Sequence, residues 1–140
     1  MVVEKSVGAV VVNPDGFYLL LNRADKKGDF WEFPKGHQIE GETDIETLRR
    51  ELNEEIGIEK IELIENFIGK NEYISSSTGN TRIILLYLVK LPDDKIIISA
   101  EHKGYIWTTL IDALVKLNHD TWREILINAD KRLTELTLNI

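Results

Sequence analysis

A helix enclosed by glycine-containing loops constrains the fold of this chain more than any other sequence feature. It begins at Thr43-Asp44-Ile45-Glu46, which has the spacing of a capping box with Thr43 as the N-cap and Glu46 reaching back to it. Gly57 stands where a helix C-terminal stop belongs. Between these ends the apolar residues recur at helical spacing: Ile45, Leu48, Leu52 and Ile56. We therefore predict a helix from Thr43 to Ile56 that buries one face.

The same helix carries a cluster of carboxylates beside its apolar stripe. Glu51 and Glu55 are four residues apart and share a face, and Glu54 lies on the same flank. Such carboxylates repel one another, and a hard divalent cation, Mg²⁺ or Mn²⁺, would remove that repulsion. Arg50 is placed to anchor one carboxylate by a bidentate pair. For three glutamates taken alone, a solvated acidic surface is the simpler interpretation.

The remaining chain alternates strand-like and helix-like segments without a repeat or a linker. We predict strands at residues 2–12, 17–21, 61–73, 82–90 and 104–108, and a short aromatic segment at 30–33. The turn at residues 13–16 predicts a hairpin between the first two strands, and Pro34, Gly36 and Gly41 indicate an irregular loop. Further helices are expected at residues 110–117 and 120–136. This order predicts an α/β (α+β) fold with a mixed sheet.

Composition excludes several classes of protein. The 140 residues are expected to form one domain, and the absence of cysteine rules out disulfides and thiolate metal sites. The longest apolar stretch, residues 83–89, is too short to span a bilayer, and residues 1–12 lack a signal-peptide layout. We therefore expect a cytoplasmic protein with no membrane contact. A net charge of −7 without a basic cluster argues against duplex nucleic acid as a partner.

Nine positions around the predicted helix fit one signature without a gap, G-x5-E-x7-R-E-U-x-E-E-x-G-U, where U is a bulky aliphatic residue. They are Gly36, Glu42, Arg50, Glu51, Leu52, Glu54, Glu55, Gly57 and Ile58. This pattern resembles the Nudix hydrolase family. The resemblance implies a single Nudix domain over residues 1–140, folded as an α/β/α sandwich with a central mixed sheet, and a loop-helix-loop Nudix box at 36–58.

The resemblance also implies roles for particular residues. The metal site would lie at Glu51, Glu54, Glu55 and Gly36, with Mg²⁺ or Mn²⁺ as the cofactor. Arg50 would orient the carboxylates and Glu42 would support them. Water would attack phosphorus in a polyphosphate chain, and its proton would pass to Glu54 or to a loop glutamate. Glu101 is the loop candidate, and its alternative role is that of an ordinary exposed acid.

Two further stretches bear on the substrate, which would be a small nucleotide. Residues 31–37 resemble the W-x-x-P-K-G-H run of the asymmetrical diadenosine tetraphosphate hydrolases, and residues 101–107 resemble their E-H-x-x-Y-x-W. By this resemblance Lys35 and His37 would contact phosphates, and Tyr73 and Tyr105 would stack on adenine. Arg82 is a further candidate for the phosphates. The hairpin at residues 75–80 departs from the subfamily because it is neutral.

The sequence is therefore compatible with three functions. The leading one is a Mg²⁺-dependent hydrolase that splits diadenosine tetraphosphate into ATP and AMP. The alternative removes pyrophosphate from a nucleoside triphosphate or an RNA 5′ end, because W-x-F-P-x-G also resembles bacterial RNA pyrophosphohydrolases. A different class is a catalytically silent nucleotide-binding module, although such modules usually lose box glutamates that are all present here. The helix from Asp120 would pack on the core or, alternatively, form a homodimer interface.

Overall fold

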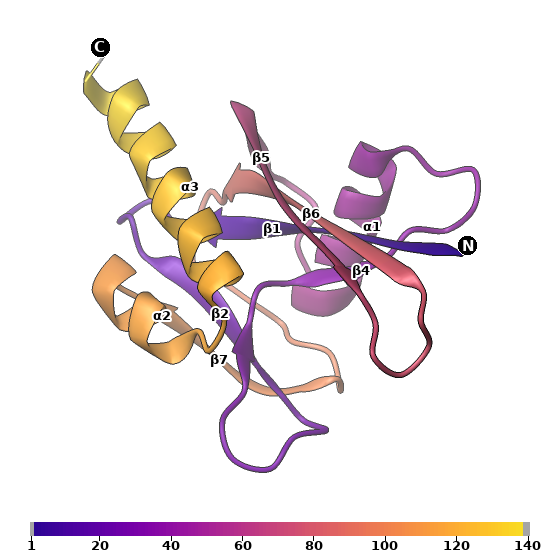
Figure 1. The fold of residues 1–140 in the computed structure, drawn as a ribbon. Coiled ribbons are helices and arrows are strands. Elements are labelled where there is room, and N and C mark those ends of the chain that lie inside the picture. Colours follow the sequence, from indigo (N-terminus) through magenta and orange to yellow (C-terminus); the bar gives the residue numbers. More distant parts are fainter. Residues whose placement is uncertain (1, 139–140) are drawn as a thin grey trace.

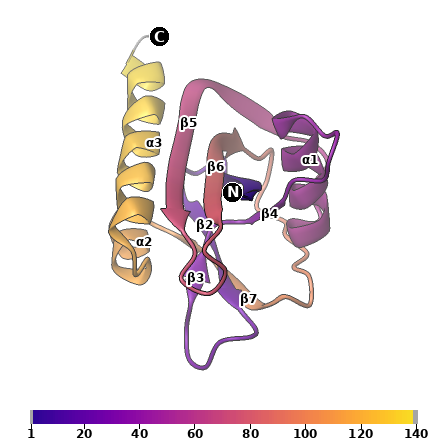
Figure 2. The ribbon, with the colours of Figure 1, turned by 45° about the vertical axis from the view of Figure 1, so that its right-hand side comes forward.

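A computed structural model describes residues 2–138 as a mixed sheet with helices on both of its faces (Figure 1). Figure 2 shows the layers edge-on, with α3 on one side of the sheet and α1 on the other. The elements in chain order are β1 (Val3–Val12), β2 (Tyr18–Arg23), β3 (Trp31–Glu32), β4 (Lys35–His37), α1 (Asp44–Ile56), β5 (Glu62–Ile74), β6 (Thr81–Lys90), β7 (His102–Thr108), α2 (Leu110–Lys116) and α3 (Asp120–Leu138). The predicted mixed α/β sandwich is confirmed.

The sheet combines parallel and antiparallel pairs. Its main path runs β3-β2-β1-β6-β5, and within it β1 and β6 are parallel along their whole length. β4 pairs with β1 and β7 pairs with β2, both antiparallel. Strand β1 therefore lies at the centre, and its inner residues 7–12 are buried on both faces. This burial agrees with the apolar character of both faces of the predicted first strand.

Of two sequence predictions near β1, one is confirmed and one needs correction. The expected hairpin between the first two strands is present, since β1 and β2 pair antiparallel, but its register has a single pair, Val12 with Tyr18. The edge of β1 that β2 leaves open is taken by β4, in the segment predicted to be only an irregular loop. Gly8 makes this pairing close, since a Cβ there would lie 2.1 Å from the carbonyl oxygen of Pro34.

Each face of the sheet has its own apolar core. On one face, α2 and α3 cover buried side chains of β1, β2 and β6; from α3 these include Ile125, Leu126 and Ala129. The interpretation of the last helix as a core-packing element is thus confirmed. On the other face, α1 buries Leu48, Leu52 and Ile56 against the sheet. In the described part of the chain, no helix is both long and apolar enough to pass through a membrane.

Helix α1 begins and ends as its sequence predicts. The Thr43 hydroxyl accepts from the N–H of Glu46, and the Glu46 carboxylate accepts from the N–H of Thr43, so the capping box is complete. Gly57 follows in the left-handed conformation with φ of 70°, and its N–H closes the last turn. These caps fix which turn of the helix carries each glutamate.

Candidate active site

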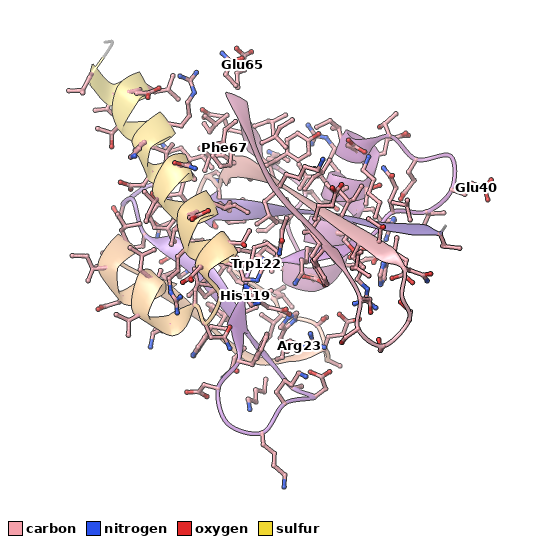
Figure 3. The ribbon with its side chains drawn as sticks, in the orientation of Figure 1. Arg23, Glu40, Glu65, Phe67, His119 and Trp122 are labelled. Carbon is pink, nitrogen blue, oxygen red and sulfur yellow. The ribbon has the colours of Figure 1, made fainter. Side chains whose placement is uncertain are left out.

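A cleft of about 1370 Å³ opens where α1, the end of β2, the β5–β6 hairpin and the start of α3 converge. This volume exceeds the range of about 300–1,000 Å³ that is usual for sites of drug-sized ligands. Figure 3 labels three of its lining residues, His119 and Trp122 at the start of α3 and Arg23 at the end of β2. Acidic residues of α1 line another wall of the same cleft.

Arg50 is the centre of the hydrogen-bond network on the α1 wall. Its Nε and Nη2 donate to the two carboxylate oxygens of Glu42 at 2.8 and 3.0 Å, a bidentate pair. Its Nη1 donates to Glu51 at 2.7 Å and to Glu54 at 3.2 Å, and its Nη2 also reaches the carbonyl of His37. The Arg50 guanidinium, first of all, lowers the pKa of Glu42 to about 2. The predicted pairing of Arg50 and its link to a supporting carboxylate are both present.

The Glu51 carboxylate packs directly on β4 because Gly36 has no side chain. A Cβ built on Gly36 would lie 2.0 Å from both Cδ and Oε2 of Glu51. Burial raises the pKa of Glu51, and the charges of Glu54 and Glu101 add to that rise against the opposing effect of Arg50. Glu101 lies in the loop before β7, far from α1 in the sequence, and its charge nevertheless acts on Glu51 in the α1 wall.

Glu55 is the most enclosed of the three helix carboxylates. Its side chain accepts the backbone N–H of Lys35 at 3.0 Å, and the residue is only 6% exposed. Burial raises the pKa of Glu55 to about 8, and the charges of Glu51 and Glu32 push it in the same direction. Glu54, in contrast, projects outward with a side chain 58% exposed. The three glutamates therefore differ sharply in environment although they lie within five residues.

The donor set suits a hard divalent cation, but its side chains are not gathered around one point. Residues 2–138 contain no group of three His, Cys, Asp or Glu side chains arranged to hold a metal ion. Arg50 occupies oxygens of Glu51 and Glu54, and the Lys35 N–H occupies one of Glu55. Carboxylate oxygens are the ligands that Mg²⁺ prefers. Burial raises the pKa of Glu51 and of Glu55, so ionising these carboxyl groups costs free energy, and a bound cation would offset that cost. The chemistry of the residues thus fits the metal.

The predicted phosphate-binding residues line the same cleft as these acids, and each contacts a local partner. Lys35 Nζ donates to Glu32 at 2.9 Å, and its ammonium lies over the Trp122 ring. His37 Nδ1 lies 3.4 Å from the Ser6 hydroxyl. Three cationic or titratable side chains, Lys35, His37 and Arg82, therefore share one cavity.

Arg82 and Tyr73 face each other across the β5–β6 ladder. They are register partners, and Arg82 Nε also donates to Glu4 at 2.8 Å. The hydrogen bond with Tyr73 and then that with Glu4 raise the pKa of Arg82. Tyr73 is 40% exposed within the cleft, so its ring is available to a ligand. The structure thus brings two of the predicted substrate residues into contact.

Tyr105 is the predicted site residue that the structure does not bring to the cleft. It pairs with Leu21 in the β2–β7 ladder and is 41% exposed, but it is not among the residues that line the cavity. Glu101, four residues earlier, does line it. The two residues belong to one sequence motif, but Glu101 precedes β7 and lines the cleft, whereas Tyr105 lies within β7 and does not.

Glu32, His102 and Trp122 are among the cleft residues to which the sequence assigned no role. His102 and Glu32 bond to each other at 2.8 Å. Trp122 packs edge-on against Phe33 with ring centroids 6.3 Å apart. Glu32 and His102 lie inside the two stretches that resemble the hydrolase motifs, and this position in the sequence could have pointed to them. Only the folded sheet shows that their side chains are in contact.

Comparisons with known proteins identify the family of this chain. Residues 3–129 match the model of the NUDIX domain family. The chain is 41% identical over 98 residues to the rat bis(5'-nucleosyl)-tetraphosphatase [asymmetrical], a match that covers 69% of this chain and 66% of the rat protein. It is 36% identical over 70 residues to an RNA pyrophosphohydrolase of Pelagibacter ubique, covering 50% of this chain and 44% of that one.

The fold has a close counterpart among solved structures. A C. elegans Ap4A hydrolase in a binary complex superposes with a TM-score of 0.81 at 24% identity, covering 98% of this chain and 99% of that one. The architecture, the complete box and the family match over most of the chain lead to one conclusion. The chain belongs to the NUDIX domain family.

Proposed function

We propose that this protein is a Mg²⁺-dependent hydrolase that cleaves diadenosine tetraphosphate to ATP and AMP, with Mn²⁺ as a substitute metal. The observation that carries the proposal is the cleft itself. Its walls carry three kinds of side chain: the acids Glu51, Glu54, Glu55 and Glu101; the nitrogen-bearing groups of Lys35, His37 and Arg82; and the aromatic rings of Tyr73 and Trp122. The similarity to relatives named bis(5'-nucleosyl)-tetraphosphatase supports this choice of substrate.

Each residue has a role that its position supports. Glu51, Glu54 and Glu55, with Gly36 providing the space beside them, would hold the metal. When bound, the metal supplies charge neutralisation for the polyphosphate and activation of water. Arg50 keeps the carboxylates in place through its bonds to two of them and to Glu42.

The chain's own groups then bind the substrate and move the proton. Lys35, His37 and Arg82 contact the phosphates, and Lys35 exchanges its bond to Glu32 for a phosphate oxygen. A nucleobase stacks on Tyr73. The exposed carboxylate of Glu101 or of Glu54 accepts a proton from the attacking water. All of these groups lie on the walls of one cavity, which lets a single extended ligand contact them together.

An RNA 5′-end or nucleoside triphosphate pyrophosphohydrolase is the second candidate. It is favoured by the similarity to RNA pyrophosphohydrolases and by the Trp31-Glu32-Phe33-Pro34-Lys35-Gly36 run. A catalytically silent binding module is the third, and the complete set of box glutamates argues against it. We also propose a cytoplasmic location with a small nucleotide as partner; a homodimer stays a prediction that gel filtration tests.

A metal-dependent assay separates these functions. The purified protein is given diadenosine tetraphosphate, ATP, dNTPs and triphosphorylated RNA with Mg²⁺, with Mn²⁺ or with chelator, and the products are resolved by ion-exchange chromatography. We expect equimolar ATP and AMP from the dinucleotide, and little turnover by Glu55→Gln. Faster release of pyrophosphate from dNTPs or RNA would contradict the proposed substrate. Tight nucleotide binding without turnover would indicate the silent module.

A further inference from the structure

A buried hydrogen bond connects two strands that are not neighbours in the sheet. Glu32 in β3 and His102 in β7 both pair with β2, so they lie two strands apart, about 10 Å between backbones. Their side chains cross that gap, with Nε2 of His102 2.8 Å from Oε2 of Glu32. The imidazole is only 2% exposed and the carboxylate 15%. This contact ties the first residue of β7 to the short strand that leads into the phosphate-binding loop.

The direction of the bond follows from its partners. Burial would raise the pKa of Glu32, but the bonds from His102 and Lys35 outweigh it and lower the pKa, so the carboxylate is ionised and accepts. His102 must then donate from Nε2. Its Nδ1 is buried without a hydrogen-bond partner among residues 2–138, so the bond at Nε2 is the one hydrogen bond that orients the ring there. The ring therefore presents an N–H to Glu32 at Nε2.

The neighbour of His102 is the loop acid of the cleft. The Glu101 carboxylate makes no hydrogen bond or ion pair in the described part of the chain, although its charge acts on Arg23 and on Glu51. The backbone of the loop therefore sets the position from which this side chain extends. That backbone is held by the N–H of Ala24, which donates to the Glu101 carbonyl at 2.9 Å, and by the N–H of Ser99, which donates to the Glu55 carbonyl at 3.1 Å. The Glu101 N–H also donates to Ser99 Oγ at 3.4 Å, and the His102 N–H donates to the Ser99 carbonyl at 3.2 Å. The His102 side chain adds the bond to Glu32 in β3. Next to His102 the β2–β7 register shifts, which leaves Lys103 as an extra residue in the ladder.

We propose that His102, acting through Glu32, is a positioning residue that fixes the Glu101 carboxylate over the metal-binding face of α1. The inference rests on the proposed function, in which Glu101 takes part in proton transfer. In the ligand-free protein Glu32 also accepts from Lys35 with its other oxygen, so one carboxylate contacts both His102 and the lysine that we propose passes to a phosphate. A shift of about 1 Å in a reacting group costs about 100-fold in rate, so such an anchor affects turnover more than binding.

Three substitutions at His102 test whether turnover needs the hydrogen-bond donor at Nε2. Glutamine places an amide N–H where the histidine has Nε2, whereas asparagine is one methylene shorter and methionine has similar length but no donor. We expect His102→Asn and His102→Met to lower kcat for diadenosine tetraphosphate by about 10- to 100-fold, with KM changed by less than about threefold. His102→Gln should restore kcat to within about threefold of wild type. Equal loss in all three variants, or a rise in KM alone, would overturn the inference.

Two measurements decide the point without turnover. Long-range ¹H–¹⁵N NMR spectra of the wild-type protein should show the His102 ring protonated on Nε2; a ring protonated on Nδ1 alone would refute the anchor. Amide exchange at Ala24 should be faster in the Asn and Met variants and normal in the Gln variant. If the wild-type protein fails to cleave the dinucleotide, the proposed substrate is wrong. The NMR spectrum and the exchange of the Ala24 amide still test whether the His102 side chain holds the Glu101 backbone in place. Unchanged Ala24 exchange in a folded Met variant would refute it.

Discussion

Replacing Glu55 by glutamine should stabilise the metal-free protein, and the gain should grow with pH. Burial, above all, raises the pKa of Glu55 from 4.5 to about 8. Over this range the folded protein keeps a proton that the unfolded chain releases. The free energy of unfolding of wild type therefore falls as pH rises from about 4.5 to about 8, and glutamine, which has no proton to lose, removes that part of the pH dependence.

The size of the effect follows from the pKa difference. A pKa difference of one unit between the folded and unfolded states corresponds to about 1.4 kcal/mol of stability. The pKa of Glu55 changes from 4.5 to about 8 on folding, and most of this range lies between pH 5 and pH 7.5. The stability difference between Glu55→Gln and wild type should therefore increase by about 3 kcal/mol over those pH values. Glutamine keeps a carbonyl oxygen that can accept the N–H of Lys35, so the local hydrogen bond is retained. The same variant should lose most of its turnover, because it lacks one of the carboxylates that we propose bind the metal.

Urea unfolding in the presence of a chelator measures this difference at pH 5, 6, 7 and 7.5. Glu124→Gln is a matched control, because Glu124 is an exposed glutamate on α3 and its substitution should change stability little at any pH. Curves for wild type and Glu55→Gln that stay parallel across the range would refute the reasoning. Added Mg²⁺ should stabilise wild type more at pH 7.5 than at pH 5, since the cation competes with the proton for the carboxyl group.

Three further substitutions test other parts of the site. Gly36→Ala puts a methyl group 2.0 Å from the Glu51 carboxylate, so it should lower the free energy of unfolding by about 1–3 kcal/mol and kcat by more than about tenfold, as urea unfolding and steady-state kinetics would show. Arg50→Lys cannot form the bidentate pair with Glu42, and calorimetry should show weaker Mg²⁺ binding; unchanged affinity would contradict the orienting role. Tyr73→Leu should raise KM about tenfold through lost stacking, whereas Tyr73→Phe and Tyr105→Leu should not; equal effects of the two leucine variants would mean that the cleft is wrongly assigned.

The local features of this chain could be predicted because they depend on neighbours in sequence. A helix places residues three and four apart on one face, so the spacing of Glu51, Glu54 and Glu55 already gave their common flank. The capping box and Gly57 likewise fixed the ends of α1 from residues in direct contact along the chain. The family resemblance rested on the same short stretch, and the match over residues 3–129 agrees with it.

The environment of each group depended on the order of strands, which short-range spacing does not encode. Three carboxylates of similar sequence context became one exposed group and two buried ones, because α1 packs one flank against β4. β4 itself forms because β2 leaves β1 after one register pair. The contact of Glu32 with His102 joins residues 70 apart in sequence across β2. By itself the sequence determined the helix and its acids; only the tertiary structure decided their burial and their partners, because both depend on strand order and register.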